Sequence, residues 1–238
     1  QKYNPIIKTL ESTLNSSPKV HKKTKSNVVS DRNFSYGNPK EAFKKADKIV
    51  ELKIEYPRNS CTPLEGFVVE SNYNTAENSY TVQSNFQGPF SLHSVISRSL
   101  NVNENKLRLL SNQDSGGSFG IKQAILPMIV LTCLASRISG KNIKWVEDRI
   151  EHLTAASSAT NRVTTIKAAV KRNGEILALD YDQIDDVGAY LRAPEPASLY
   201  RMHGNLSGAY LVKNISCRNR VVLTNKTPTG LNRGFGGP

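Results

Sequence analysis

Residues that commonly bind metals or form disulfide bonds are scarce in this sequence of 238 residues. It has three cysteines, Cys61, Cys133 and Cys217, which lie far apart and form no C-x-x-C pair. An odd number of distant cysteines excludes a disulfide framework and a thiolate metal site, and it indicates a reducing compartment. The four histidines also lack metal-ligand spacing. We therefore expect no metal ion held by the side chains of this chain.

Long hydrophobic runs and targeting signals are absent as well. The apolar run 124–135 has about a dozen residues, which is too few to cross a bilayer and typical of a buried core helix. No signal peptide is visible, so we expect a cytoplasmic protein without a membrane span. Because the sequence starts at Gln and stops at Gly-Gly-Pro, we expect both ends to continue in a longer protein.

Positive charge is in excess, with a net charge of +12 and a pI of about 9.6. A basic nucleic-acid-binding domain is therefore one interpretation. Lys and Arg are scattered, however, apart from the run 19–25, and no aromatic residues alternate with them as in a single-strand binder. An acidic partner or subunit, or a basic interior facing a phosphorylated cofactor, fits as well, and we favour these over nucleic acid.

The hydrophobic pattern divides the chain into two parts. Residues 1–35 are polar and rich in Lys, Ser and Asn, which predicts an extended connector. Residues 36–238 alternate between helical and strand patterns, which predicts a single α+β lobe. It includes a helix starting at Asn38-Pro39, a half-buried strand over 48–56 and a helix over 195–203.

Two β-hairpins are expected inside this lobe, one over 66–84 and one over 162–184. In outline, each is followed by a helix, a strand and a Gly-rich loop. We therefore expect two related halves, each with a mixed sheet and packed helices.

The Gly-rich stretch 113–122, QDSGGSFGIK, lies between a strand-like run and an apolar helical run. Gly116, Gly117 and Gly120 remove three β-carbons, so the backbone can approach a ligand closely. A strand, such a loop and a helix start form a natural cradle for an anion. The alternative is a tight strand-to-helix connection without a ligand. The stretch matches neither G-x-G-x-x-G nor the P-loop.

Two other loops have unusual composition. The loop 84–89 contains Gln87, whose amide can both donate and accept hydrogen bonds. The loop 225–238 contains Arg233, whose guanidinium can bind an oxyanion with two parallel hydrogen bonds. Taken singly, Gln87 could be a helix cap and Arg233 a surface charge. No Ser/His/Asp or Cys/His arrangement accompanies them, so any chemistry would come from a cofactor.

Five motifs follow one another along the chain: SNFQGPFSLHSVISRSLNV, DSGGSFGIK, KWVEDRIEHL, DVGAYLR and TNKTPTGLNRGFGGP. In this order they resemble the molybdenum-cofactor subunit of the xanthine oxidase family, in particular its carbon monoxide dehydrogenase-type and aldehyde oxidoreductase-type large chains. The resemblance runs from about residue 27 to the end. It implies that residues 36–238 are the first cofactor-binding lobe, while an N-terminal domain and a second lobe are not included.

The resemblance also assigns site residues. It implies that Gln87 hydrogen-bonds a ligand of the molybdenum and that Phe119 and Arg233 lie close to the metal; these three form the expected catalytic set. The expected cofactor-binding residues are Gln87, Gly116, Gly117, Ser118, Phe119, Gly120, Arg233 and Gly234. In the family the pterin dithiolene supplies the sulfur ligands, so the resemblance does not require a Cys/His cluster.

Departures from the family pattern narrow the expected substrates and metals. Ser118 stands where many members have a third Gly, and we expect this small residue to be tolerated. Gln123 replaces a Glu of purine-oxidising members, which argues against a purine substrate. Gly234 replaces the copper-binding Cys of true carbon monoxide dehydrogenases, so no copper is expected. The family's catalytic base, a Glu, belongs to the second lobe.

The resemblance therefore predicts part of an oxidoreductase that hydroxylates an aldehyde or an N-heterocycle with water as the oxygen source. The cofactor would be molybdenum-molybdopterin, in the cytosine dinucleotide form. The expected partners are the second cofactor-binding lobe, an iron–sulfur subunit and an FAD subunit, and we expect the isolated chain to be inactive. The alternative from another class is a non-catalytic cofactor-carrying or assembly module.

Overall fold

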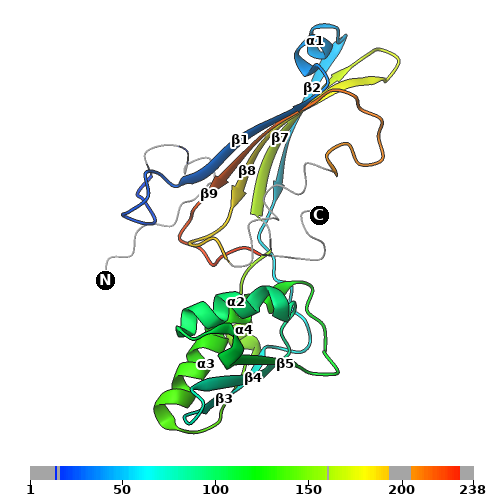
Figure 1. The fold of residues 1–238 in the computed structure, drawn as a ribbon. Coiled ribbons are helices and arrows are strands. Elements are labelled where there is room, and N and C mark those ends of the chain that lie inside the picture. The colour runs from blue at the N-terminus through cyan, green and yellow to red at the C-terminus, as the bar shows by residue number, and fades with distance from the viewer. Residues whose placement is uncertain (1–13, 15–16, 160, 193–204, 231–238) are drawn as a thin grey trace.

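The structure is a computed structural model that describes residues 14, 17–159, 161–192 and 205–230. Its strands form two sheets, one of five strands and one of four (Figure 1). The predicted helix over 195–203 and the predicted site residues Arg233 and Gly234 lie outside the described residues.

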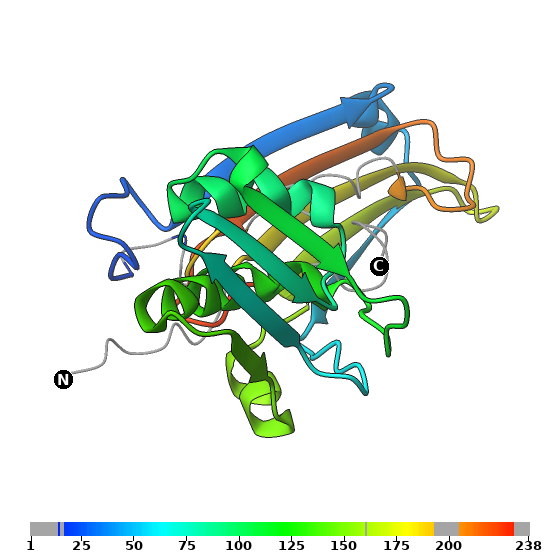
Figure 2. The ribbon, with the colours of Figure 1, turned by 60° about the horizontal axis from the view of Figure 1, so that its bottom comes forward.

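The four-stranded sheet carries most of the helices and the main hydrophobic core. Its order is β5-β4-β3-β6, from β3 (Val68–Asn74), β4 (Ser79–Ser84), β5 (Leu107–Ser111) and β6 (Ile143–Val146). It is joined by α2 (Pro89–Leu100), α3 (Leu126–Ser139), α4 (Arg149–Ala155) and the short 3₁₀ helices η2 (Glu104–Lys106) and η3 (Ile121–Ile125). The helices α2 and α3 lie on the side of the sheet that faces the five-stranded sheet (Figures 1 and 2).

The five-stranded sheet is long and has fewer helices. Its order is β1-β9-β8-β7-β2, from β1 (Val28–Tyr36), β2 (Lys48–Tyr56), β7 (Asn161–Val170), β8 (Ile176–Asp186) and β9 (Ile215–Val222). The helix α1 (Pro39–Lys44) packs at one end of this sheet (Figure 1). There Ala42 meets Ala169 and Ala178 in a small apolar cluster.

The two sheets repeat one pairing pattern. In one, β3 and β4 are antiparallel, and β5 is parallel to β4. In the other, β7 and β8 are antiparallel, and β9 is parallel to β8. A further antiparallel strand completes each set, β6 beside β3 and β2 beside β7. The predicted α+β class, with mixed sheets and packed helices, is confirmed, and the shared pattern agrees with two related halves.

The predicted connector over 1–35 extends too far, because residues 28–36 form the edge strand β1. This strand pairs with β9 along its length. Much of its support is polar: the Arg218 guanidinium forms two hydrogen bonds with the Asp31 carboxylate, at 3.0 and 2.8 Å. A strand held by backbone pairing and charge shows no hydrophobic alternation, so the pattern analysis could not detect it.

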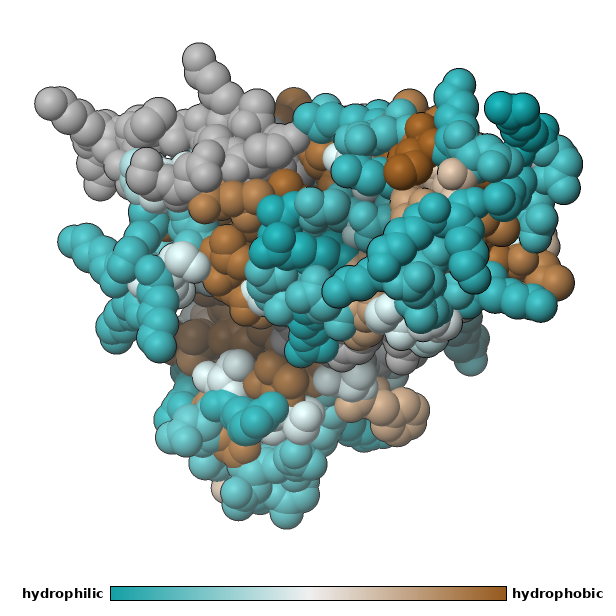
Figure 3. All heavy atoms as spheres, turned by 90° about the horizontal axis from the view of Figure 1, so that it is seen from above, coloured by the Kyte–Doolittle hydropathy of each residue, from teal (hydrophilic) through white to brown (hydrophobic). Residues whose placement is uncertain are grey.

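The strand β2 has the predicted bounds but not the predicted burial, since each of its residues is exposed. Its alternating apolar side chains Val50, Leu52, Ile54 and Tyr56 are 42–58% exposed. Apolar groups also reach the surface among hydrophilic ones in the view from the α1 end (Figure 3). Alternation indicates that a strand has an apolar face, but it cannot say whether this chain covers it.

The apolar segment Ile121–Ser139 is long and hydrophobic enough, by composition alone, to cross a membrane. In the fold it packs against β3, β6 and α2 instead. Ile129, Thr132, Cys133 and Ser136 are buried in this contact. The predicted packing of a core helix is thus found on one part of its surface, while Leu131 and Ile138 are 60% and 86% exposed.

Candidate functional site

Two of the predicted site loops are in direct contact. Ser118 Oγ donates a hydrogen bond to Gln87 Oε1 at 2.6 Å, and the Gln87 backbone N–H donates to the Lys122 carbonyl at 3.3 Å. The first loop follows β4, and the second follows β5, the strand parallel to β4. Adjacent parallel strands end at the same edge of their sheet, which explains why these loops meet.

The Gly-rich loop has an unusual backbone. Its φ angles are +96° at Gly117, +54° at Phe119 and +100° at Gly120. A positive φ at a bulky residue is strained and tends to occur at functional sites. Ser118 holds this conformation, because its Oγ accepts hydrogen bonds from the N–H groups of Gly120 and Lys122, both at 3.2 Å.

Donors remain available in this loop. Among the described residues, no acceptor is found for the backbone N–H groups of Gly117 and Ser118. The Phe119 side chain is 42% exposed beside them. A loop with unpaired N–H groups and an exposed aromatic ring can bind a flat, anionic ligand.

Gly116 is required for a different reason, a close approach to Glu65. A β-carbon at position 116 would lie 2.6 Å from Glu65 Cβ. The Gly116 N–H donates to Glu65 Oε2 at 3.0 Å. Any larger residue would push the loop away from this carboxylate.

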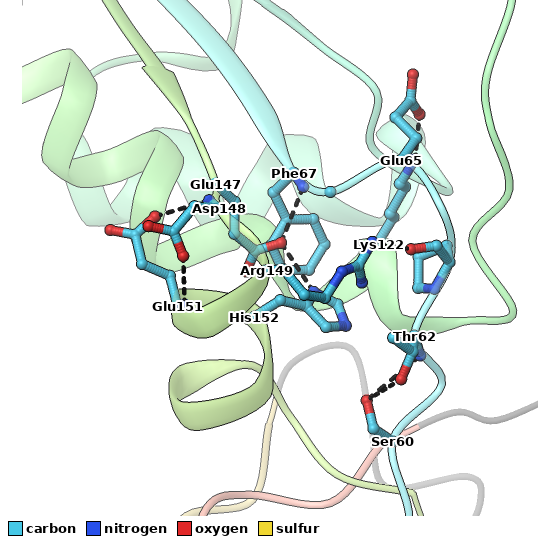
Figure 4. A network of polar contacts seen from close by, with 12 residues as sticks. Ser60, Thr62, Glu65, Phe67, Lys122, Glu147, Asp148, Arg149, Glu151 and His152 are labelled. Atoms are coloured by element: carbon cyan, nitrogen blue, oxygen red, sulfur yellow. Dashed lines mark hydrogen bonds and ion pairs between the residues drawn. The ribbon is translucent and has the colours of Figure 1, made fainter.

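Glu65 receives several hydrogen bonds on one oxygen. Besides Gly116, Asn85 Nδ2 donates to Oε2 at 2.8 Å. Lys122 Nζ forms an ion pair with the same oxygen (Figure 4). The Lys122 side chain is fully buried, while that of Glu65 is 34% exposed. The Lys122 ammonium, aided by Asn85 and the Gly116 N–H, holds the pKa of Glu65 below its ordinary value.

Sequence reasoning missed Glu65 and gave Lys122 no role. The residues around Glu65, CTPLEG, form no recognisable pattern. Lys122 did carry a signal, since a lysine at the start of a long apolar helical run must either reach solvent or find a buried partner.

The motif KWVEDRIEHL supports the segment that carries Glu65. Glu147 Oε2 accepts from the Phe67 N–H at 3.0 Å and contacts His152 Nδ1 at 2.8 Å. Arg149, which is labelled in Figure 4, donates to the carbonyls of Pro63 and Leu64, at 2.8 and 2.9 Å. The helix α4 begins with a capping box in which Asp148 is the cap, which fixes these side chains relative to the segment.

A second buried carboxylate anchors the chain leading to the other Gly-rich loop. Asp186 accepts from Arg58 at 2.9 Å, from the Gly188 N–H at 2.7 Å and from Thr224 Oγ1 at 2.7 Å. Arg58 also donates to the Thr227 carbonyl at 2.6 Å. The motif DVGAYLR thus holds residues 224–230, while Arg233 and Gly234 are outside the described part.

Gln123 lies next to the loop of Gln87. A β-carbon on Gly88, whose φ is +70°, would be 3.1 Å from Gln123 Nε2. Among the described residues, the buried Gln123 Oε1 has no hydrogen-bond partner. The amide therefore has an unused acceptor at the edge of the site.

Two cavities of about 520 and 610 Å³ lie against the five-stranded sheet, the second lined by α1 and by residues such as Lys167 and Arg218. Within the described ranges no group of three or more His, Cys, Asp or Glu side chains could hold a metal ion. A metal at the Gly-rich loop would thus need ligands from outside the described residues.

Comparison with known proteins shows the family to which the chain belongs. Residues 20–238 match the family described as the molybdopterin cofactor-binding domain. The chain is 32% identical over 205 residues to the 6-hydroxypseudooxynicotine dehydrogenase complex subunit gamma of Paenarthrobacter nicotinovorans, covering 85% of this chain and 25% of that protein. It is 31% identical over 193 residues to the carbon monoxide dehydrogenase large chain of Hydrogenophaga pseudoflava, covering 79% of this chain and 24% of that protein.

A solved structure has the same fold. Quinoline 2-oxidoreductase from Pseudomonas putida 86 superposes with a TM-score of 0.89 and 26% sequence identity, over 98% of this chain and 30% of that one. The chain thus spans about a quarter of the length of these two curated relatives.

Proposed function

The chain belongs to the molybdopterin cofactor-binding domain family, within the large subunits of xanthine oxidase-type molybdenum hydroxylases, and from this membership we propose that its two contacting loops form one wall of a molybdenum-cofactor site. The observation that carries the proposal is the hydrogen bond from Ser118 to Gln87. It joins the two motif loops that the resemblance assigned to the cofactor, and it does so beside unpaired backbone donors.

Gln87 has a specific role in this proposal. The hydrogen bond from Ser118 to Oε1 fixes the orientation of the amide, so Nε2, which carries its donors, is left for a ligand. A fixed neutral donor can stabilise negative charge on a ligand without adding a charge of its own. When bound, the cofactor supplies the redox chemistry, an oxidative hydroxylation with water as the oxygen source.

In this proposal the loop backbone binds the cofactor, and the backbone and Phe119 together orient it. The N–H groups of Gly117 and Ser118 face the anionic part of the cofactor, and the exposed Phe119 ring excludes water from one side of the reacting carbon. Arg233 adds a planar cation from the second Gly-rich loop. Gly116 lets the loop come close to Glu65, while Gly120 and Gly234 would let the backbone come close to the cofactor.

The substrate proposal is an aldehyde or an N-heterocycle. Gln123 supports a neutral substrate, because an amide with a free acceptor can hold an N–H group but offers no carboxylate. Gly234 offers no thiolate, which supports chemistry without copper. Molybdopterin cytosine dinucleotide is the proposed cofactor form, and the cytoplasm the proposed location.

Partners are part of the proposal. The exposed row Val50, Leu52, Ile54 and Tyr56 on β2 supports docking of a second cofactor-binding lobe, since a contiguous apolar face of this kind is uncommon on a free surface. An iron–sulfur subunit and an FAD subunit would remove the electrons. The second lobe would supply the catalytic base.

The competing function is a cofactor-carrying or assembly module without catalysis. The two are separated by measuring molybdenum and pterin content together with dye reduction driven by aldehydes or N-heterocycles, in the chain assembled with its second lobe. If the protein is an enzyme, we expect both bound cofactor and dye reduction. If it is a carrier, we expect bound cofactor without dye reduction. Absence of cofactor, with steeply salt-dependent DNA affinity, would favour the basic nucleic-acid binder instead.

A further inference from the structure

Glu65 belongs to none of the five motifs, yet it contacts both motif loops at the candidate site. It lies in the connection between β2 and β3. Its Oε2 accepts from Asn85 in the Gln87 loop, at 2.8 Å, and from Gly116 in the Gly-rich loop, at 3.0 Å. One carboxylate oxygen therefore links two loops that are far apart in sequence.

Lys122 fixes this carboxylate in place. Its side chain has no exposed surface, so its ammonium needs a charged partner inside the protein, and Glu65 is the partner present. Gly116 and Lys122 lie at the two ends of the strained segment that contains Gly117, Phe119 and Gly120. The same oxygen therefore holds both ends of this segment.

The support of Glu65 is itself rigid. Its neighbours on both sides are tied to the α4 motif, by Arg149 on the carbonyls of Pro63 and Leu64 and by Glu147 on the Phe67 N–H. These hydrogen bonds hold the backbone on both sides of Glu65 independently of the loop. The arrangement has the features of a fixed support behind a binding surface.

We propose that Glu65 is a positioning residue for the cofactor loop, held in place by Lys122 and by the α4 motif. Glu65 sets the distance between the Gln87 loop and the Gly-rich loop and keeps the N–H groups of Gly117 and Ser118 directed at the ligand. This inference rests on the proposed function for the identity of the ligand, but the tether itself exists without a ligand.

The test compares Glu65→Gln, Lys122→Met and the double variant Glu65→Gln/Lys122→Met in the complete subunit. The matched control is Asp31→Asn, which breaks an ion pair with Arg218 on the exposed face of the five-stranded sheet. The first measurement is amide hydrogen exchange at Gly116, Gly120 and Lys122 in cofactor-free protein. The second is the pterin content of protein produced with its cofactor.

Glu65→Gln should speed exchange at these three amides by about tenfold or more, as expected when a charge-assisted hydrogen bond is lost, and should lower pterin content. Exchange in β7 and β8 should not change, and Asp31→Asn should behave as wild type. If Glu65→Gln does not fold, the double variant carries the test, because it leaves no unpaired buried charge. It should fold yet keep the fast exchange and the low pterin content.

Wild-type exchange and pterin content in the double variant would overturn the inference, since the pair would then only neutralise a buried lysine. A different result would contradict the proposed function. A wild-type protein without pterin would contradict that function, while the exchange rates would still decide whether Glu65 holds the loop.

Discussion

Ser118 Oγ lies 2.6 Å from Gln87 Oε1, so a side chain of the Gly-rich loop fixes the orientation of the glutamine amide. The same hydroxyl oxygen accepts from two backbone N–H groups of its own loop. From the family pattern we expected only that a small residue would be tolerated at position 118. In this chain Ser118 instead orients Gln87 and holds the backbone of its own loop.

Ser118→Ala should therefore weaken the site rather than leave it unchanged. It removes one donor and one shared acceptor, which costs about 1 kcal/mol for each hydrogen bond that is not replaced by water. We expect lower cofactor content and a lower melting temperature. The control is Ser99→Ala, which removes a hydroxyl from the exposed end of α2. Equal behaviour of both variants would contradict the role of Ser118.

Gln87→Ala in the complete enzyme should lower kcat by about 10²-fold, because one preorganised donor is worth on the order of 3 kcal/mol in a transition state. Gln83→Ala, on the exposed side of β4, is the control. Steady-state dye reduction measures both. A near-normal rate for Gln87→Ala would show that Gln87 is only a loop residue.

Arg233→Ala should lower both cofactor content and rate, and by more than Gln87→Ala, because a buried anionic group would lose its partner. Arg233→Lys should not restore either, since an ammonium cannot reproduce the planar fork. Gly234→Cys should not create carbon monoxide oxidation, because a copper site needs more than one sulfur. Normal activity and molybdenum content in Arg233→Ala would identify Arg233 as a surface charge.

The lowered pKa of Glu65 predicts how the stability of the folded chain depends on pH. It lies below the ordinary 4.5 in the folded chain. The carboxylate therefore contributes stability that is fully present above about pH 4.5 and is lost as the pH falls through the lower folded value. Urea unfolding at several pH values should show the difference between wild type and Glu65→Gln shrinking below pH 4.5. A difference that stays constant down to pH 3 would contradict this.

The apolar face of β2 should matter for assembly and little for the fold of this chain. Leu52 is 58% exposed, so Leu52→Lys should change the free energy of unfolding by no more than about 0.5 kcal/mol. It should nevertheless reduce co-purification with the second lobe. Lys53→Ala, on the opposite side of the same strand, is the control. Unchanged co-purification of Leu52→Lys would place the interface elsewhere.

Local signals predicted the elements well where one residue type decides the geometry. Asn38 caps α1, accepting from the Glu41 N–H at 3.4 Å, with Pro39 as the first helical residue. Gly140 ends α3 with a φ of +66°. The resemblance led to Gln87 and the Gly-rich loop, and the structure places them in contact.

Contacts between residues far apart in the chain could not be predicted from the sequence. β1 pairs with β9, almost two hundred residues away, through contacts such as Asp31 with Arg218. Glu65 reaches Lys122 across 57 positions. Neither leaves a periodic pattern, because each depends on where the backbone of another segment runs.

Two glycines allow a direct test of whether the backbone of the Gly-rich loop binds the cofactor, as we propose. Gly117 and Gly174 have φ angles of +96° and +88°, so a valine is strained at either position. Neither faces a clash: Gly117 has Pro63 Cβ at 3.7 Å and Gly174 has nothing within 4 Å.

The measurement is pterin and molybdenum content of Gly117→Val and Gly174→Val, each assembled with the second lobe. Gly117→Val should lose the cofactor while the protein stays folded, and Gly174→Val, in the turn between β7 and β8, should retain it. Full cofactor content in Gly117→Val would contradict the account.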